Sequence, residues 1–84
     1  MKYALEQEPD MIITITGHTD NIGKRKANLK LSKRRAVNVR DFMIENGFDR
    51  DRLQVHYKGP DEPIASNNSE KGRKKNRRVE IRIK

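Results

Sequence analysis

The stretch that decides the fold is Met11–Thr16, MIITIT, together with the loop sequence Gly17–Gly23, GHTDNIG, that follows it. The first stretch is rich in β-branched residues, which favour extended structure, and its odd-numbered apolar residues fall on one side of an extended chain. The second stretch consists of turn-forming residues. We therefore predict a strand that ends in a loop and presents Thr19 and Asp20 at its carboxyl end.

The chain beyond this loop alternates helical and extended patterns. No residue breaks a helix over Ala27–Asn46, and Gly47 tolerates the left-handed geometry of a C-terminal cap. Apolar and polar residues alternate in Leu53–Tyr57 and in Arg78–Lys84, as in half-buried strands. Between these strands, Glu70–Asn76 can hold a short helical turn. We therefore predict an α+β fold, in which helices pack on one face of a small mixed sheet and water wets the other face.

The composition limits the chain to one small domain with a strongly basic surface. Its 84 residues allow a single domain, residues 1–84, and no apolar run approaches the ~20 residues that a membrane-spanning helix needs. The absence of cysteine excludes a disulfide framework and a thiolate metal site. The net charge of +8 is concentrated in residues 24–40 and 71–84, so nucleic acid, anionic lipid headgroups and anionic wall polymers are all candidate partners. The alternative is a basic face that is simply solvated.

An arginine interrupts the apolar face of the predicted long helix. Four residues follow at intervals of four and share one stripe: Leu31, Arg35, Val39 and Met43. The Arg35 guanidinium must extend to the edge of this face or meet an anion, because a buried unpaired charge is strongly unfavourable. The structural alternative is an internal ion pair with Asp20, and Asp20 alone could be an ordinary turn carboxylate. Together, the two side chains form a matched receptor for a zwitterion, such as an amino-acid-like headgroup.

A series of short motifs runs in order along nearly the whole chain. It comprises Gly17-His18-Thr19-Asp20, Gly23, Asn28, Leu31-Ser32, Arg35-Ala36, Val39, Gly47, Arg52-Leu53, Gly59, Pro63, Asn67, Gly72-Arg73 and Asn76-Arg77-Arg78-Val79-Glu80-Ile81. The series resembles the core motif of OmpA-like peptidoglycan-binding domains, which include Pal lipoproteins and the MotB flagellar stator protein. The resemblance implies an OmpA-like βαβαβ fold that is truncated at the N-terminus. The family's first strand would be missing, and Lys2–Glu8 would be the end of its first helix.

The resemblance also implies a ligand and a set of site residues. Members of the family bind peptidoglycan non-covalently through the diaminopimelate of the stem peptide. By position, Asp20 would take the ammonium group and Arg35 the carboxylate, while Thr19, Asn28 and Arg77 would orient the ligand. Asn28 and Arg35 are seven residues apart, two helical turns, and so share a face of the helix. The implied ligand is therefore the kind of zwitterion that Asp20 and Arg35 suit.

The resemblance places the chain in the bacterial envelope. We expect it to be part of a larger, membrane-associated protein in the periplasm, which anchors the outer membrane or an envelope complex to the cell wall. The missing first strand would leave a sheet edge unpaired, which favours a homodimer. The loop that follows this first strand normally contributes to the family's ligand pocket. In addition, Pro60 stands where relatives often carry glycine or an aromatic residue, so the loop that follows Gly59 is expected to differ in shape.

Other functions are less well supported by the residues. A basic nucleic-acid-binding module is the alternative, through the Lys/Arg-rich segments, but Phe42, Phe48 and Tyr57 are expected in the core and leave no stacking platform for bases. A purely structural domain, in which Asp20 and Arg35 pair with each other, is a third possibility. His18 and Asp20 are too few ligands for a metal site, and a hydrolytic triad of these two residues with Ser32 would need a placement that the sequence does not indicate. We expect no enzymatic activity, no metal, no cofactor and no nucleic-acid partner.

Overall fold

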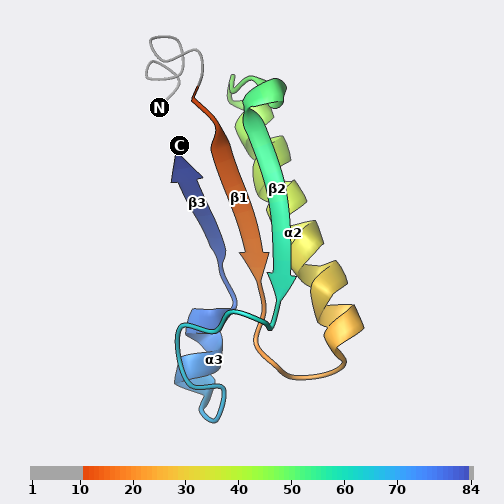
Figure 1. Ribbon diagram of the computed structural model, residues 1–84, viewed down its shortest axis with the longest axis vertical. Coiled ribbons are helices and arrows are strands. Elements are labelled where there is room, and N and C mark those ends of the chain that lie inside the picture. Colours follow the sequence, from red (N-terminus) through yellow and green to blue (C-terminus); the bar gives the residue numbers. More distant parts are fainter. Residues whose placement is uncertain (1–10, 84) are drawn as a thin grey trace.

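A computed structural model describes residues 11–83, which form one three-stranded sheet and two α-helices (Figure 1). In chain order the elements are β1 (Ile13–His18), α2 (Arg25–Glu45), the 3₁₀ turn η1 (Arg50–Arg52), β2 (Leu53–Gly59), α3 (Glu70–Asn76) and β3 (Val79–Ile83). The strand order is β2-β1-β3, with β1 parallel to β2 and antiparallel to β3. The α+β class and the small mixed sheet that the sequence predicts are confirmed.

The bounds of the three strands and of α2 differ from the prediction by one or two residues. Strand β1 continues through Gly17 and His18, because Gly17 still pairs with Val79 of β3. Helix α2 begins two residues early, at Arg25, and its last helical residue is Glu45. The predicted end of a first helix, Lys2–Glu8, lies outside the described residues.

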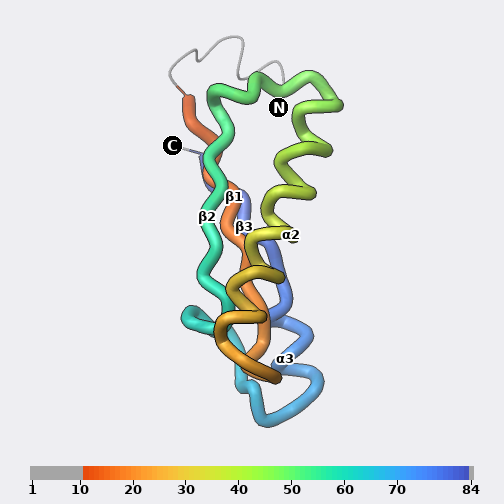
Figure 2. The backbone as a smooth tube through the Cα atoms, turned by 90° about the vertical axis from the view of Figure 1, so that its right-hand side faces the viewer, coloured from red at the N-terminus to blue at the C-terminus, as the bar shows by residue number. Residues whose placement is uncertain are grey.

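Helix α2 packs along one face of the sheet, over β1 and β2, as Figures 1 and 2 show. The core between them consists of five side chains: Ile13, Ile15, Ala36, Met43 and Leu53. Full burial of a large aliphatic side chain contributes roughly 1.5–3 kcal/mol, so this small core can stabilise only a small domain. No helix in residues 11–83 is long and apolar enough to span a membrane.

The face that α2 presents to the sheet differs from the predicted apolar stripe. Its buried residues are Asn28, Ser32, Ala36 and Met43, while Leu31 and Arg35 lie half-buried at the edge of the contact. Small side chains face the sheet because the helix approaches β1 very closely. A Cβ atom at Gly17 would lie 2.0 Å from the carbonyl oxygen of Ser32. The close contact at Gly17 therefore decides which side of α2 faces the sheet. The position of Arg35 does not decide it.

Strand β3 is barely covered by α2, and two of the three aromatic residues expected in the core, Phe42 and Tyr57, are exposed. Ile81 and Ile83 are 46% and 49% exposed, and Phe42 of α2 is 66% exposed. Tyr57 of β2 is also exposed, whereas Phe48 packs against the core as predicted. Alternation along a strand shows which side chains share a face. It does not show whether a helix covers that face.

The Gly17 contact leads to a stability prediction. Gly17→Ala should lower the free energy of unfolding by about 1–3 kcal/mol, because the new methyl group would overlap backbone that can move only if α2 moves. Urea denaturation measures the change. Gly23→Asn is the control, since Gly23 has φ +85° but open space around it, and asparagine tolerates that region. A Gly17→Ala chain as stable as the wild type would contradict the close contact.

Candidate ligand-binding site

The loop that follows β1 is held from both sides by backbone hydrogen bonds. The amide of His18 donates to the carbonyl oxygen of Arg78 at 2.9 Å, and the amide of Thr19 donates to that of Gly59, also at 2.9 Å. Thr19 is 3% exposed and Asp20 is 8% exposed. The predicted site residues therefore leave the sheet at a fixed point, where β1 ends beside β2.

Asp20 is both a turn carboxylate and a member of an ion pair. Its Oδ1 accepts from the amide of Ile22 at 3.0 Å, and its Oδ2 accepts from Nη1 of Arg77 at 3.0 Å. Each carboxylate oxygen can accept two hydrogen bonds, so each keeps one further acceptor site. The side chain is 11% exposed, which leaves a small part of it open to a ligand. Asp20 can therefore accept another donor without losing its present partners.

Arg77 lies between two carboxylates. Its Nη1 binds Asp20, and its Nη2 donates to Oε1 of Glu70, whose other oxygen accepts from Nε and Nη2 of Arg73 at 3.3 Å each. The hydrogen bond from Arg77 is the main reason that the pKa of Glu70 lies below its usual value. We did not predict a role for Glu70. One feature of the sequence could have indicated this ion pair: Glu70 and Arg77 are seven residues apart, which is two helical turns.

Arg35 does not pair with Asp20, so the internal ion pair considered from the sequence is wrong. Its Nη1 donates only a long hydrogen bond, 3.4 Å, to the carbonyl oxygen of His18. Within residues 11–83 no carboxylate lies within ion-pair distance of Arg35. The side chain is half-buried at the edge of α2. Arg35 therefore has guanidinium donors available beside the strand end that leads to Asp20.

Thr19 and Asn28 hold the shape of the loop. Oγ1 of Thr19 donates to the carbonyl oxygen of Asp20 at 2.7 Å, and Nδ2 of Asn28 donates to that of Ile22 at 2.9 Å. The structure thus connects four of the predicted residues, Thr19, Asp20, Asn28 and Arg77, around one loop. Arg35 joins this group through His18.

Asn76, just before Arg77, is the residue that the sequence reasoning missed most clearly. It is fully buried, and its Oδ1 accepts from the amides of Ile64 and Ala65 at 2.8 and 3.0 Å. Its Nδ2 donates to the carbonyl oxygen of Ala65 at 3.0 Å and to Oδ1 of Asn67 at 2.8 Å. Asn76 therefore fixes the end of α3 to the preceding loop and so places Arg77. These partners lie 9 to 12 residues away across an irregular loop, so no periodic pattern could reveal them.

His18 also has a structural partner. The ring is 1% exposed, and its Nε2 lies 2.9 Å from Oε2 of Glu80 on β3. Burial tends to raise the pKa of Glu80, but the charge of Arg78 and the hydrogen bond with His18 together hold it below its usual value. This contact ties the end of β1 to β3, directly before the loop that carries Asp20.

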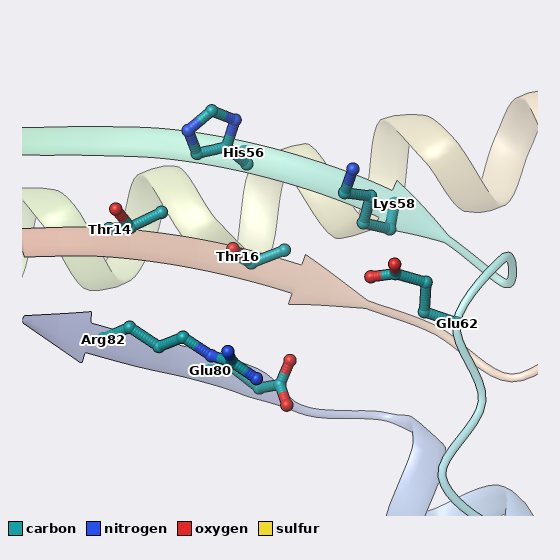
Figure 3. A pocket seen from close by; sticks show the side chains of 7 residues that line it. All are labelled: Thr14, Thr16, His56, Lys58, Glu62, Glu80 and Arg82. Atoms are coloured by element: carbon teal, nitrogen blue, oxygen red, sulfur yellow. The ribbon is translucent and has the colours of Figure 1, made fainter.

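The face of the sheet away from α2 carries a shallow hollow of about 360 Å³, shown in Figure 3. The lining residues are Thr14, Thr16, His56, Lys58, Glu62, Glu80 and Arg82. None of them belongs to the predicted ligand-binding set, and the Glu80 carboxylate already contacts His18 and Arg78. The hollow contains exposed side chains of both charge signs. We interpret it as the polar, wetted face that the alternation of the strands predicts.

Comparisons with known proteins agree on one family. The model of the OmpA family matches residues 1–77. Outer membrane protein A of Bordetella avium is 46% identical over 71 residues, which are 84% of this chain and 37% of that protein. The peptidoglycan-binding protein ArfA of Mycobacterium tuberculosis is 45% identical over 73 residues, 87% of this chain and 22% of that protein. The chain thus spans well under half the length of these relatives.

Solved structures show the same fold. The peptidoglycan-associated lipoprotein of Burkholderia pseudomallei superposes with a TM-score of 0.91 at 28% identity, covering 99% of this chain and 70% of that one. The C-terminal domain of Helicobacter pylori MotB gives a TM-score of 0.85 at 30% identity, covering 99% and 67%.

The pairing of Glu70 leads to a pH prediction. Because the pKa of Glu70 is lowered in the folded chain, its carboxylate stabilises the fold above its usual value of 4.5, and this contribution disappears as the pH falls through the lowered folded-state value. Glu70→Gln should therefore lower the thermal midpoint slightly near neutral pH and not in strong acid. Glu62→Gln, in the exposed loop, is the control. A difference between wild type and Glu70→Gln that does not change with pH would contradict the assignment.

Proposed function

The chain belongs to the OmpA family, and from that premise we propose that it binds peptidoglycan non-covalently through the diaminopimelate of the stem peptide. The observation that carries this proposal is a pair of charged side chains at the carboxyl end of β1, each of which can make further hydrogen bonds. Asp20 keeps acceptor sites on both oxygens, and Arg35 has no carboxylate partner among the described residues. A purely structural ion pair would satisfy both groups.

The side group of diaminopimelate carries an ammonium and a carboxylate on one carbon. In the proposed complex, Asp20 accepts from the ammonium, and Arg35 donates to the carboxylate through the two parallel N–H groups of its fork. Hydrogen bonds between charged groups contribute about 1.5–3 kcal/mol each, more than neutral ones do. A ligand without a carboxylate would leave Arg35 without an anionic partner, and a ligand without an ammonium would bring its carboxylate close to Asp20 with no compensating charge, so the pair selects a zwitterion.

The remaining residues of the site would position these two groups. Thr19 and Asn28 bind the backbone of the loop, so they fix the direction of the Asp20 carboxylate. Arg77 holds one oxygen of Asp20, while Glu70 compensates the charge of Arg77. We infer that this compensation keeps Asp20 attractive to an ammonium, because an uncompensated guanidinium at 3.0 Å would repel the ligand's positive group.

We propose binding without turnover, and an envelope location. Asp20 is engaged by a backbone amide and a guanidinium, an arrangement that suits a charged acceptor rather than a proton-transfer group. The relatives named above include an outer membrane protein and a lipoprotein, which supports a place in the periplasm, as part of an outer-membrane or other envelope-anchored protein. The nucleic-acid alternative rests on charge alone, and no relative named above is described as a nucleic-acid-binding protein.

Sedimentation with purified insoluble peptidoglycan at moderate salt tests the site. Asp20→Ala and Arg35→Ala should each weaken retention by a factor of about thirty or more, since removing one member of a desolvated charge pair costs about 2–5 kcal/mol. Free diaminopimelate should release the wild-type chain. Asp61→Ala and Arg40→Ala are matched controls, because each removes the same charge from an exposed pair. Equal retention of Asp20→Ala and wild type would contradict the proposal and indicate binding by charge alone.

We also propose that the chain can form a homodimer. Among the described strands β3 lies at the edge of the sheet, and an unpaired edge is a template for a second chain. The half-exposed Ile81 and Ile83 on this strand would add apolar contact area.

Sedimentation velocity at increasing protein concentration measures this association. Ile81→Lys should shift the chain toward the monomer, because it places a charge on the apolar face of β3. Arg82→Gln, on the opposite face of the same strand, should leave the association unchanged or strengthen it. A wild-type chain that stays monomeric at about 10⁻⁴ M, far above the dissociation constants of most specific complexes, would exclude the dimer.

A further inference from the structure

A row of cations lies on the exposed side of α2. We call it the basic stripe: Lys26, Lys30, Lys33 and Arg34. All four side chains are exposed, and residues 24–40 contain no carboxylate. Lys33 lies over the ring of Tyr57, with Nζ 5.6 Å from the ring centre. Within the described part of the chain, none of the four has a carboxylate within ion-pair distance.

The basic stripe weakens the helix that carries it. Lys26, Lys30 and Arg34 follow at intervals of four, where like charges on a helix repel each other. The first turn of α2 has no acidic residue, and Lys24 at the N-cap makes no side-chain cap hydrogen bond. Positive charge at a helix N-terminus also opposes the helix dipole. A surface that only needed to be soluble could mix both signs of charge, so the stripe leaves four cations available to an external anionic partner.

The shape of the stripe indicates what kind of partner it fits. It extends about 12 Å along a convex helix, from Lys26 to Arg34, and so presents charge to a surface rather than enclosing a small anion. Clusters of four to eight Lys and Arg residues on a helix are typical of binding to anionic lipid headgroups. The stripe contacts one exposed aromatic side chain, Tyr57, and a single ring is a small platform for stacking nucleic-acid bases.

The stripe and the candidate ligand-binding site occupy different sides of the same helix. From the helical repeat, Arg35 and Asn28 lie within about 20° of each other, and the stripe residues lie roughly 100–180° around the axis from Arg35. A surface that contacts the stripe therefore leaves the Arg35 side of α2 open. Binding at the two places need not compete.

We propose that the basic stripe docks this domain on a bilayer that contains anionic phospholipid. The contact is peripheral and electrostatic. Lysine and arginine side chains reach the headgroups, and no apolar segment has to insert. A domain docked in this way holds its Asp20 and Arg35 side free for a second ligand. The proposal does not rest on the peptidoglycan site, because no residue of that site belongs to the stripe.

Cosedimentation with lipid vesicles tests the proposal with a charge-matched pair of variants. The stripe variant carries Lys26→Gln, Lys30→Gln and Arg34→Gln. The control carries Lys71→Gln, Lys74→Gln and Lys75→Gln on α3, where the three lysines are also exposed. Both variants lose three positive charges, so nonspecific attraction falls equally. Circular dichroism checks that both remain folded, as glutamine is compatible with a helix.

The wild-type chain should bind vesicles of phosphatidylcholine mixed with phosphatidylglycerol, and binding should weaken as salt is added. The stripe variant should bind about tenfold or more weakly, since each basic residue near the surface contributes to affinity, while the control should stay within about threefold of wild type. Both variants should still sediment with peptidoglycan through the other side of α2, which separates failure here from failure of that site.

Four outcomes would overturn the proposal. Equal loss in the two variants would mean that only net charge matters. Equal binding of the wild type to pure phosphatidylcholine, or no binding to either vesicle, would exclude anionic lipid as the partner. Selective loss of binding to a short DNA duplex, with vesicle binding unchanged in the stripe variant, would assign the stripe to nucleic acid instead.

Discussion

The backbone contact between Gly17 and Ser32 sets the distance between α2 and the central strand, and the arrangement around the site depends on it. A Cβ atom at Gly17 would lie 2.0 Å from the Ser32 carbonyl oxygen, so only glycine allows this approach. At that distance Oγ of Ser32 accepts from the amide of Gly59 at 3.0 Å. Gly59 in turn accepts from the amide of Thr19 at 2.9 Å. One close contact thus joins the helix, β2 and the loop that carries Asp20.

A network of ion pairs adds to this packing contact. Asp20, Arg77, Glu70 and Arg73 form a chain of alternating charge that connects the β1 loop to α3. Each charge has a neighbour of opposite sign, so the chain is close to neutral, although Asp20 is nearly buried. Arg35 stands outside this chain. That asymmetry, a satisfied network beside a guanidinium with donors to spare, is the feature that the proposed ligand would use.

Helix α2 contributes residues to two different surfaces, the buried contact with the sheet and the exposed basic stripe. Its inner side supplies Ala36 and Met43 to the core and Asn28 to the loop. Its outer side carries the basic stripe, which contributes nothing to the core. A helix shows different residues at different angles, so one element can hold a wall ligand on one flank and face an anionic surface on the other. The two roles would place the domain between a membrane and the cell wall.

The sequence by itself determined the elements and named the candidate site residues. Periodicity predicted both β1 and α2 to within two residues at each end, and glycine and proline marked the loops, because these signals are local and need no knowledge of the fold. The motif order named Thr19, Asp20, Asn28 and Arg77, and the structure connects these four residues around one loop. Only the tertiary structure decided which cation pairs with Asp20. Arg77 is 57 residues away and reaches it because β3 lies beside β1, whereas Arg35, the nearer choice along the chain, points to a carbonyl oxygen. Only the tertiary structure showed that Phe42 and Ile81 are exposed, because burial depends on which element covers a face, and that is a property of the whole chain packed in space.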